Sequence, residues 1–429
     1  MKVNTFLELA LRTIETYIPR PLYVFLQPSY HYTLALLSAF VYRFPSKHIA
    51  VIGITGTKGK SSTIELVNAI LEEQGFKTAL VSTLRFKIGE TTERNLFKMT
   101  LPGRFFLQHF LRRAVNAGCN YAIIEMTSEG VRQFRHKFIY LDALIFTNLS
   151  PEHIEAHGSF ETYKKTKLKL TKSLAHSGKE KRIIIANVDD EHGKDFLDIE
   201  VELNVPYSLN DAEPYTVHEN SISLTFENTL ITSSLNGTFN LYNILAAASF
   251  ARSIGIDTRV IKRGIKKVTM IPGRVERVDE GQNFDVIVDY AHTPDSLLKL
   301  YQAFPERSKI CVLGNTGGGR DRWKRSVMGG IADRYCKIII LTNEDPYDEN
   351  PKAIVDEMAH GIKNHRPRII MDRREAIGYA LKEAKRNDVV LITGKGTDPF
   401  IMGSRGSKEP WSDSRVAHKA LTLVRDKNA

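Results

Sequence analysis

The chain has 429 residues, and its 60 lysine and arginine residues against 49 aspartate and glutamate residues give a formal net charge of +11. This length corresponds to two or three domains, and 42% apolar with 25% charged residues excludes a disordered chain. The positive charge favours acidic partners such as nucleotides, nucleic acid or an anionic membrane. The three cysteines, Cys119, Cys311 and Cys336, lack CxxC spacing. The sequence therefore predicts neither a disulfide framework nor a zinc site, and a reducing cytoplasm fits best.

Residues 1–47 are expected to form a short helical N-terminal segment. Apolar residues recur at helical spacing over 6–18, and two glutamates in this stretch are unlike a signal peptide. Residues 21–42 are apolar, but a polar cluster around Pro28 interrupts them, so the unbroken run is too short to cross a membrane. We expect a helical hairpin packed on the body of the protein. Contact with a membrane surface is the less favoured alternative, with Arg20, Arg43 and Lys47 as flanking cations.

From residue 48 onward, short β-branched runs alternate with segments of helical period, which predicts a parallel sheet in an α/β domain over residues 48–270. The expected strands are HIAVIGIT, TALVST, YAIIEM, ALIFTN and RIIIAN, and the first helix covers residues 61–74. Polar alternation over residues 200–235 predicts antiparallel hairpins at one edge of this sheet, followed by a helix over 242–254.

The same rhythm restarts after Pro272 and predicts a second α/β domain over residues 271–429. The expected strands are DVIVDY, KICVLG, KIIILT, RIIM and DVVLIT. The expected helices cover residues 294–304, 326–335, 351–363 and 374–386. Ligands of such sheets bind beyond the carboxyl ends of the strands.

Residues 51–63, VIGITGTKGKSST, combine a strand, a glycine-rich turn and the start of a helix. The glycines let backbone N–H groups turn inward, Lys60 adds a charge for the β- and γ-phosphates, and Ser61 can hold Mg2+. Ile54 replaces the first glycine of the general pattern, so the match is to the variant GTxGK(S/T)(S/T). ATP is the ligand that this turn favours. The nucleotide-binding residues are Gly56, Thr57, Lys58, Gly59, Lys60, Ser61 and Ser62.

A carboxylate and an imidazole follow two other predicted strands of the first domain. Glu125 in IIEMTSEG and His153 in TNLSPEH are suitable ligands for a divalent cation that bridges phosphates, although a structural role is also open on composition alone. Lys167 lies in YKKTKLKL. An ordinary lysine is cationic and is therefore not a suitable ligand for a metal ion. Considered by itself, Lys167 is expected on a solvated helix face.

Eight motifs occur in the order found in the Mur ligases: GTKGKSS, IEMTSEG, TNLSPEH, NGTFNLYN, PGRVE, VDYAHTPDS, GGGRDRWKR and GKGTD. The chain resembles this family over residues 50–400, most closely the members that add the third amino acid of the peptidoglycan stem. The resemblance implies a central P-loop ATPase domain and a C-terminal Rossmann-like α/β domain, with ATP and Mg2+ as cofactors. In this family the lysine matching Lys167 is carbamylated, which makes it a carboxylate-like metal ligand. The implied metal ligands are then Ser61, Glu125, His153 and Lys167, and the implied catalytic residues are Lys60, His153 and Lys167.

The resemblance also assigns the rest of the nucleotide site. Asn240 and Asn243 match residues near the adenine, and Asp289 matches the residue near the ribose. Arg274 is expected to approach the phosphates, with His292 nearby. From the residues alone, the two asparagines are expected in a helix cap and a polar turn.

By resemblance, two further groups of residues match positions that bind the two substrates. Residues 91–111 are expected to form a loop and an amphipathic helix with Pro102 near its start. Thr100 and Pro102 match the segment that contacts the N-acetylmuramyl part of the acceptor, although Thr100 is equally suited to a capping role. Arg320, Gly394 and Asp398 are expected to hold the α-carboxylate and α-amine of the incoming amino acid.

The side chain of that amino acid is expected to be cationic. Family members that use diaminopimelate carry DNPR, whose arginine pairs with the distal carboxylate of this substrate. Here the aligned residues are Glu344, Asp345, Pro346 and Tyr347. Tyrosine cannot replace the arginine fork, and the acidic residues favour an ammonium group such as that of lysine.

By resemblance, the acceptor carboxylate attacks the γ-phosphate to give an acyl phosphate, which the amine displaces. A folylpolyglutamate synthase-like ligase and a non-catalytic cell-wall scaffold are the alternatives. VDYAHTPDS and GKGTD argue against the first, and the intact residues Lys60, Glu125, His153 and Lys167 argue against the second. One aromatic residue, Trp323, in a basic loop is weak support for nucleic-acid binding, so we expect no such partner. The expected protein is a cytoplasmic monomer with two small-molecule substrates, a muramyl peptide and an amino acid.

Typical tripeptide synthetases grip the uridine with a separate N-terminal domain, which about 47 residues are too few to build. The favoured expectation is that residues 21–44 and their cations supply a reduced site. The alternative is a different muramyl peptide, such as a lipid-linked one that the enzyme meets at the membrane surface.

Overall fold

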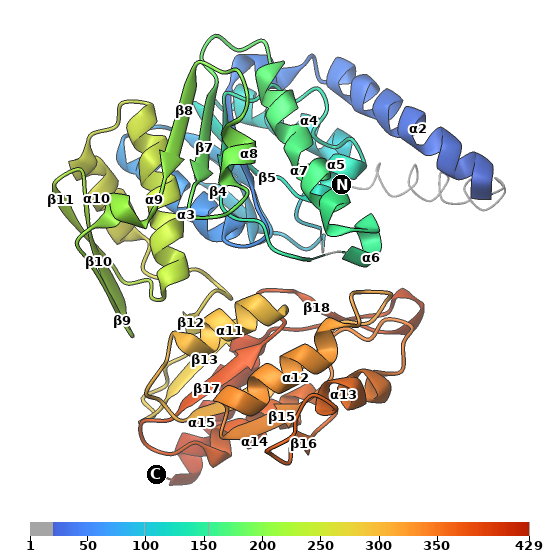
Figure 1. Ribbon diagram of the computed structural model, residues 1–429, viewed down its shortest axis with the longest axis vertical. Helices are drawn as coiled ribbons and strands as arrows, with labels where there is room; N and C mark the ends of the chain where they lie inside the picture. Colours follow the sequence, from blue (N-terminus) through green and yellow to red (C-terminus); the bar gives the residue numbers. More distant parts are fainter. Residues whose placement is uncertain (1–19, 98, 153, 429) are drawn as a thin grey trace.

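The computed structural model describes residues 20–97, 99–152 and 154–428. Two α/β domains lie one above the other in Figure 1, and each is built around its own mainly parallel sheet. The upper sheet has eight strands in the order β4–β3–β2–β5–β1–β6–β7–β8, and the five strands expected from the sequence are confirmed in it. Its strands are β1 (Ala50–Thr55), β2 (Thr78–Val81), β3 (Arg85–Ile88), β4 (Thr91–Arg94), β5 (Tyr121–Glu125), β6 (Ala143–Phe146), β7 (Ile183–Asn187) and β8 (Leu203–Tyr207).

Helices cover both faces of this sheet, which is why its central strands are apolar throughout. Neighbouring residues of β1 point to opposite faces, so that Ile52 packs in one hydrophobic cluster with α3, α9 and α10 while Val51 packs in the other with α4 and α7. The helices of this domain are α3 (Lys60–Glu73), α4 (Arg104–Asn116), α5 (Ser128–Arg132), α6 (Ile154–His157), α7 (Phe160–Ala175), α8 (Gly193–Leu197), α9 (Thr238–Ser253), α10 (Thr258–Lys267) and the 3-10 turn η2 (Leu209–Ala212).

The prediction for residues 200–235 is wrong in two respects, the direction of its first strand and the sheet to which the hairpins belong. The first strand of this region, β8, pairs in parallel with β7, and only the next three form antiparallel hairpins. These are β9 (Tyr215–His218), β10 (Ser221–Phe226) and β11 (Thr229–Ser233), which make a separate sheet. The alternate apolar residues of β10, Ile222, Leu224 and Phe226, are buried in the cluster with α9 and α10, so packing on helices holds this sheet away from the edge of the large one.

The other edge of the large sheet is formed by the antiparallel strands β3 and β4, which the sequence did not predict. Residues 91–94 were expected in a loop. All four side chains of β4 are exposed, so the strand lacks the apolar alternation that marks a half-buried strand. Helix α4 was expected to begin near Pro102, and it begins two residues later.

The lower domain has a six-stranded sheet in the order β12–β13–β17–β14–β15–β16 and a small hairpin of β18 and β19. The five strands and four helices expected here are confirmed. The strands are β12 (Glu276–Arg277), β13 (Asp285–Asp289), β14 (Lys309–Leu313), β15 (Ile338–Leu341), β16 (Arg368–Ile369), β17 (Val389–Thr393), β18 (Phe400–Met402) and β19 (Lys408–Pro410). The helices are α11 (Pro294–Gln302), α12 (Lys324–Tyr335), α13 (Pro351–Ala359), α14 (Arg373–Glu383), α15 (Asp413–Asn428) and the 3-10 turn η3 (Ser404–Gly406).

A disulfide joins Cys311 in β14 to Cys336 at the end of α12, which corrects the expectation that the cysteines stay unpaired. Their Cα atoms lie 6.1 Å apart although 25 residues separate them in sequence. Both side chains are buried in the hydrophobic cluster between the sheet and α12, and only the return of the chain through this helix brings them together. Cys119 is free and buried.

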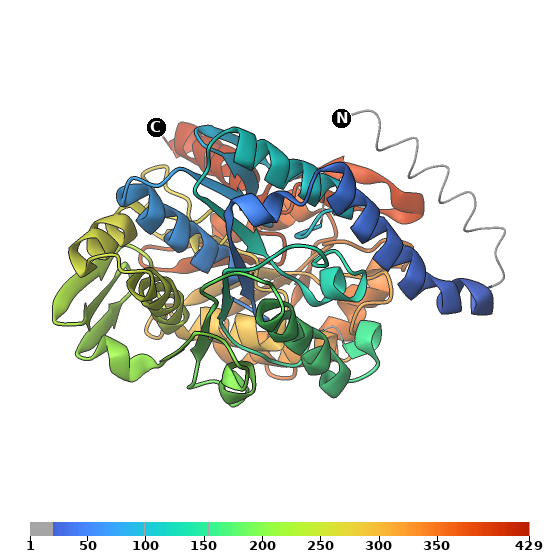
Figure 2. The same cartoon turned by 90° about the horizontal axis from the view of Figure 1, so that it is seen from above.

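Residues 20–41 form one continuous helix, α2 (Arg20–Val41), that runs along the outside of α4, as both views show (Figures 1 and 2). Pro28 lies inside this helix and is exposed, although a proline in a helix interior removes a backbone hydrogen bond and its ring crowds the preceding turn. The first half of the expected hairpin, residues 6–18, lies outside the described residues. Within the described part of the chain, no helix is long and apolar enough to span a membrane. The 3-10 turn η1 (Pro45–His48) leads into β1.

Polar groups connect the two domains, since each of the four hydrophobic clusters belongs to one domain. Arg94 donates to the carbonyl oxygen of Thr397 at 2.7 Å. The backbone N–H of Glu155 donates to Asp321 at 3.0 Å, and the side chain of Glu155 accepts from the N–H of Arg322 at 3.1 Å. A polar boundary of this kind is typical of domains that move relative to one another.

The lower domain contains a fully buried ion pair between Arg373 of α14 and Asp413 of α15, with two hydrogen bonds of 2.8 and 2.7 Å. We expect Asp413→Ala to destabilise this domain by about 3–5 kcal/mol, because it leaves the buried Arg373 guanidinium without its ion-pair partner. Urea unfolding followed by circular dichroism measures this loss. Asp356→Ala, which removes a solvent-exposed pair with Lys352, is the control and should cost less than about 1 kcal/mol. Equal losses in the two variants would contradict the prediction.

Candidate functional site

The glycine-rich turn lies between β1 and α3, as expected. Gly56 and Gly59 have φ values of +146° and +82°, which favour glycine. A Cβ atom on Gly56 would lie 2.0 Å from Thr147 Oγ1, and one on Gly59 would lie 2.3 Å from Asn243 Oδ1. No side chain caps the first turn of α3, which begins at Lys60 and includes Ser61 and the buried Ser62. The N–H groups of this turn are therefore available to an anion.

Lys60 folds back over the turn and donates to the carbonyl oxygens of Gly56 and Thr57 at 3.0 and 2.9 Å. Burial lowers the pKa of this amine, and the charges of Glu125 and Glu152 oppose that shift. An arriving phosphate would supply the negative charge that this buried cation needs.

Glu125 is buried at the end of β5 and gathers three donors on one carboxylate oxygen, Oε2. These are Ser61 Oγ at 3.1 Å, the backbone N–H of Thr83 at 2.8 Å and Thr83 Oγ1 at 3.0 Å. Thr83 Oγ1 also lies 2.8 Å from Thr100 Oγ1, so the phosphate turn, the carboxylate and the expected acceptor segment meet here. Pro102 follows and is buried just before α4. Sequence reasoning missed Thr83, although the two polar residues that follow β2, Ser82 and Thr83, were a usable signal.

Lys167 is 2% exposed, which corrects the expectation of a solvated helix face. Its Nζ donates to the carbonyl oxygen of Gly56 at 2.8 Å and lies 5.0 Å from the ring centre of Tyr163. Burial lowers the pKa of this amine well below its usual value, and the charge of Lys60 lowers it further. Neighbouring lysines point elsewhere on α7, since Lys165 pairs with Glu161 at the surface.

His153 lies outside the described residues. Among residues 20–152 and 154–428, apart from position 98, no group of three or more histidine, cysteine, aspartate and glutamate side chains is placed to hold a metal ion. The donors that the structure does bring together are Ser61 and Glu125, which are oxygen ligands of the kind that Mg2+ prefers. Lys167 donates to the carbonyl oxygen of Gly56, the same oxygen that accepts from Lys60.

Asn240 and Asn243 lie inside α9, where both are buried, and not in a cap and a turn. Asn243 accepts from Thr63 Oγ1 at 3.4 Å and donates to Asn240 Oδ1 at 2.9 Å. Asn240 in turn donates to the carbonyl oxygen of Asn236 at 2.8 Å. This chain of amides reaches α3 just behind the phosphate turn.

Asp289 at the end of β13 accepts from the backbone N–H groups of Val275 and Ala291, both at 2.7 Å. It therefore fixes the PGRVE loop against the sheet. The guanidinium of Arg274 in this loop lies 4.5 Å from the ring centre of Tyr290.

Glu152, which sequence reasoning missed, connects the phosphate turn to the lower domain. Its Oε2 lies 3.2 Å from Lys58 Nζ, and its Oε1 lies 3.0 Å from Nε2 of His292. The other ring nitrogen of His292 lies 2.7 Å from the carbonyl oxygen of Tyr290. Glu152 directly precedes His153 in the motif, but pairing across two domains leaves no signal in the sequence.

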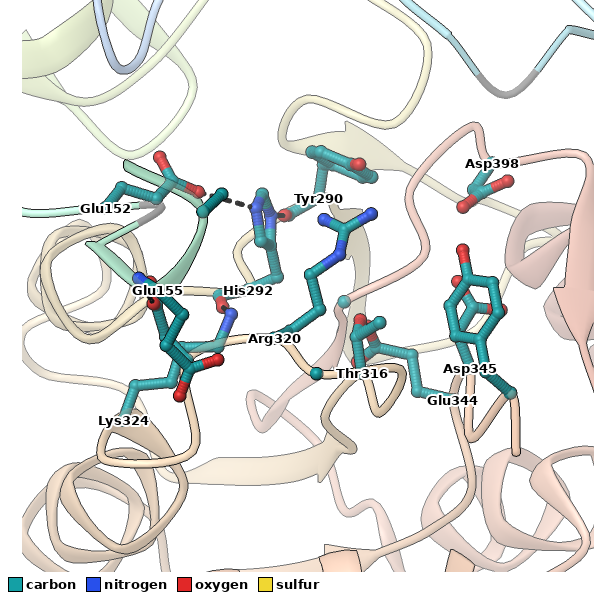
Figure 3. A pocket seen from close by; sticks show the side chains of 15 residues that line it. Glu152, Glu155, Tyr290, His292, Thr316, Arg320, Lys324, Glu344, Asp345 and Asp398 are labelled. Atoms are coloured by element: carbon teal, nitrogen blue, oxygen red, sulfur yellow. Dashed lines mark hydrogen bonds and ion pairs between the residues drawn. The ribbon is translucent and has the colours of Figure 1, made fainter. Parts of the chain in front are cut away.

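A pocket opens where the two domains meet. In Figure 3, Arg320 extends between His292 and Glu152 on one side and Asp345 and Asp398 on the other. All residues expected to hold the amino acid line this pocket: Arg320, Glu344, Asp345, Gly394 and Asp398.

Glu344 is buried, and one of its carboxylate oxygens, Oε1, accepts a hydrogen bond from Thr316 Oγ1 at 2.8 Å. Its Oε2 is buried, with no hydrogen-bond partner in the described part of the protein. Burial raises the pKa of this carboxyl group. A Cβ atom on Gly394 would lie 2.2 Å from Oε2, so only glycine leaves room for this carboxylate.

Asp345 is held inside the protein and adds less negative charge to the pocket than expected. Both of its oxygens bind Nζ of the buried Lys395, at 2.8 and 2.9 Å, and one also accepts from the N–H of Met402 at 2.7 Å. Lys395 also binds Asp398 at 3.0 Å. The sequence places this lysine 50 residues away from Asp345, which is why its pairing was missed.

Comparison with known proteins gives two matching family models. The Mur ligase middle domain matches residues 54–251, and the Mur ligase glutamate ligase domain matches residues 273–396. A protein of Syntrophomonas wolfei named UDP-N-acetylmuramoyl-L-alanyl-D-glutamate--2,6-diaminopimelate ligase is 37% identical over 92% of this chain and 82% of its own length. A UDP-N-acetylmuramyl-tripeptide synthetase of Roseiflexus is 35% identical, with the same coverage.

Solved structures agree with this likeness. A structure of a UDP-N-acetylmuramoyl-L-alanyl-D-glutamate--2,6-diaminopimelate ligase has 27% identity and a TM-score of 0.59, and the match covers 88% of this chain and 79% of that one. The folylpolyglutamate synthase of Mycobacterium tuberculosis has a TM-score of 0.69 over 91% of this chain and 94% of that one, but 16% identity. The second likeness shows the fold alone.

Proposed function

Because the chain belongs to the Mur ligase family of ATP-dependent ligases, we propose that it adds an amino acid to a UDP-N-acetylmuramyl-dipeptide-like acceptor in the synthesis of peptidoglycan precursors. The observation that carries the proposal is Glu152, which binds Lys58 of the phosphate turn and His292 beside the interdomain pocket. The carboxylate of Glu152 therefore links the phosphate site to the amino-acid pocket. This arrangement suits a reaction in which an activated carboxylate of one substrate meets the amine of another.

In the proposed reaction, an oxygen of the acceptor carboxylate attacks the γ-phosphorus and ADP leaves. The amine nitrogen then attacks the acyl carbon, phosphate leaves, and the nitrogen loses its proton. Lys60 and the N–H groups at the start of α3 stabilise the negative charge on the transferred phosphoryl group. Asp289 and Arg274 are assigned to the ribose and phosphates, and Asn240 and Asn243 to the adenine side.

Mg2+ fits the donors present, since Ser61 and Glu125 are hydrogen-bonded oxygens beside the turn, and His153 is the third proposed ligand. When bound, the metal neutralises phosphate charge. We further propose that Lys167 is carbamylated. The reaction needs a neutral amine, and burial beside Lys60 favours that form. The N–H of the carbamate can keep the bond to Gly56.

Amino-acid-dependent release of ADP tests the proposed function. We expect ADP only when ATP, a UDP-muramyl dipeptide and an amino acid are present together. ADP release without an acceptor, or none with any amino acid, would contradict the ligase proposal. A scaffold that retains the fold would release none. We also propose that the enzyme is cytoplasmic and monomeric and that it binds no nucleic acid.

The proposed amino acid is cationic, with lysine or ornithine favoured over diaminopimelate, the substrate named for several relatives. Three features of the pocket support this. Tyr347 stands where an arginine fork would be needed, Arg320 is available for the α-carboxylate, and Oε2 of Glu344 can accept an ammonium group. Asp345 contributes little, because Lys395 balances its charge.

We expect kcat/KM for lysine to exceed that for diaminopimelate at least about 10-fold. Glu344→Gln should lower kcat/KM for lysine by about 10–100-fold, because a charged hydrogen bond contributes about 1.5–3 kcal/mol. Competition assays with lysine, ornithine and diaminopimelate measure this preference. Glu409→Gln, at an exposed residue of β19, is the control. A strong preference for diaminopimelate would refute the assignment.

A further inference from the structure

A second pocket lies at the domain boundary, and it shares no lining residue with the amino-acid pocket. Its walls come from α3, β3 and β4 of the upper domain, from the start of α15 in the lower domain, and from the connecting residues 267–276. The GKGTD loop reaches both pockets. Gly394 and Asp398 line the amino-acid pocket, whereas Gly396 and Thr397 line the second pocket. A ligand in the second pocket would therefore lie beside the loop that shapes the first.

Three carboxylates line the second pocket, those of Glu65, Glu72 and Glu276. Both oxygens of each one accept hydrogen bonds within the protein. Glu65 accepts from the guanidinium of Arg85 at 3.0 and 2.6 Å. The donors to the other two carboxylates are Asn68, Thr78, Lys87, Gly273 and Ser414. A cationic ligand would have to compete with these donors, so the pocket does not favour one.

Two arginines line the same pocket without a carboxylate partner among the described residues. Arg94, at the end of β4, donates one N–H group to the carbonyl oxygen of Thr397 at 2.7 Å. Arg415, in the first turn of α15, is exposed, and its guanidinium has no hydrogen bond or ion pair with the part of the chain that the structure describes. Partial burial and then the charge of Arg415 lower the pKa of Arg94, against the opposing charges of Asp398 and Glu276. The two cations therefore repel each other, and an anion between them would remove this repulsion.

The chemistry of the two arginines indicates the kind of anion. Each guanidinium is a planar fork that can bind two oxygens of one ligand. A carboxylate has two oxygens and can satisfy one fork, whereas a phosphate group has enough oxygens for two. Leu84, Val268 and Met270 add apolar surface to the pocket, which suits the body of a phosphate ester.

We propose that Arg94 and Arg415 form a binding site for a phosphate group, either that of inorganic phosphate or that of an ester. The two arginines belong to different domains, so the bound group holds the domains together. It also lies beside Thr397 of the GKGTD loop, which Arg94 already contacts. A ligand that binds the closed arrangement more tightly than an open one shifts the protein toward closure. Binding here therefore restrains the loop that shapes the amino-acid pocket.

Calorimetric titration of the full-length protein with inorganic phosphate, phenyl phosphate and acetate tests the proposal. Saturating Mg2+ and a non-hydrolysable ATP analogue keep the phosphate turn occupied during each titration. We expect at least one of the two phosphates to bind about 10-fold or more tightly than acetate. Arg415→Gln and Arg94→Gln should each weaken this binding by about 10-fold or more, because each removes a charged donor. Tighter binding of inorganic phosphate identifies the free ion, and tighter binding of phenyl phosphate identifies an ester.

Arg386→Gln is the matched control, because Arg386 is an exposed arginine of the lower domain that lies outside the second pocket. It should leave phosphate affinity unchanged. Without phosphate, Arg415→Gln should also leave Tm unchanged, whereas a structural role of this side chain would lower Tm.

Hydrogen–deuterium exchange measures the effect on the GKGTD loop. Bound phosphate should slow exchange of the amides of residues 394–398 about 5-fold or more in the intact protein but not in the Arg415→Gln variant. Equal affinity for phosphate and acetate, equal effects of the Arg415 and Arg386 variants, or unchanged exchange with phosphate bound would overturn the proposal. Neither measurement needs turnover, so its outcome is separate from that of the ligation assay.

Discussion

Lys60→Ala is expected to lower ATP-dependent ligation by about 10²–10³-fold or more and to leave the fold intact. The amine stabilises charge that develops on the transferred phosphoryl group, and removal of one such donor has an effect of this size. Among the described residues, Nζ donates hydrogen bonds only to the carbonyl oxygens of Gly56 and Thr57, so its loss breaks no hydrogen-bonded ion pair. Amino-acid-dependent ADP release measures activity, and circular dichroism with Tm measures the fold.

Lys165→Ala provides the matched control, because it removes an exposed lysine of α7. We expect it to retain normal turnover. If the Lys60 variant turns over at the normal rate, the phosphate turn has no role in the mechanism.

Lys167→Ala is expected to abolish activity, and added formate or acetate should partly restore it by supplying the missing carboxylate oxygens. The neutral amine of Lys167 can attack CO2, so that an N–C bond forms and the nitrogen loses a proton. Because the pKa of this amine is lowered, its neutral form is present at a lower pH than for an ordinary lysine. Activity should therefore persist as pH falls until this amine and its carbamate are protonated.

Labelled bicarbonate and NMR detect the carbamate directly in the active enzyme. The Lys165 variant again serves as the control, since its amine is exposed and its activity should not respond to formate or acetate. A free amine at Lys167 in fully active protein would rule out the carbamate.

Local features of the sequence predicted the phosphate turn and most strands of both sheets. The turn lies within 13 consecutive residues, and its glycines are required by contacts with Thr147 and Asn243. The strands of the parallel sheets are buried on both faces, so they appear as continuous apolar runs. Strand β4 was missed for the opposite reason, since all its side chains are exposed.

Long-range pairing accounts for what the sequence did not predict. Lys167 has three lysine neighbours, and only the packing of α7 against the turn selects it for burial. Asp345 was expected to make the pocket acidic, but it pairs with the buried Lys395. Glu152 matters because its two oxygens face different domains.

The polar boundary between the domains has a consequence for the catalytic cycle. Contacts such as Arg94 with Thr397 and Glu155 with Asp321 exchange hydrogen bonds to water for hydrogen bonds within the protein, at little net gain. In the proposed reaction, we therefore expect substrates held between the domains to stabilise their closed arrangement. We expect this stabilisation to fall once the products have formed, so that the domains can separate. Higher ionic strength screens charged contacts at the boundary, such as Arg307 with Glu219 at 2.9 Å, and so favours opening and faster product release.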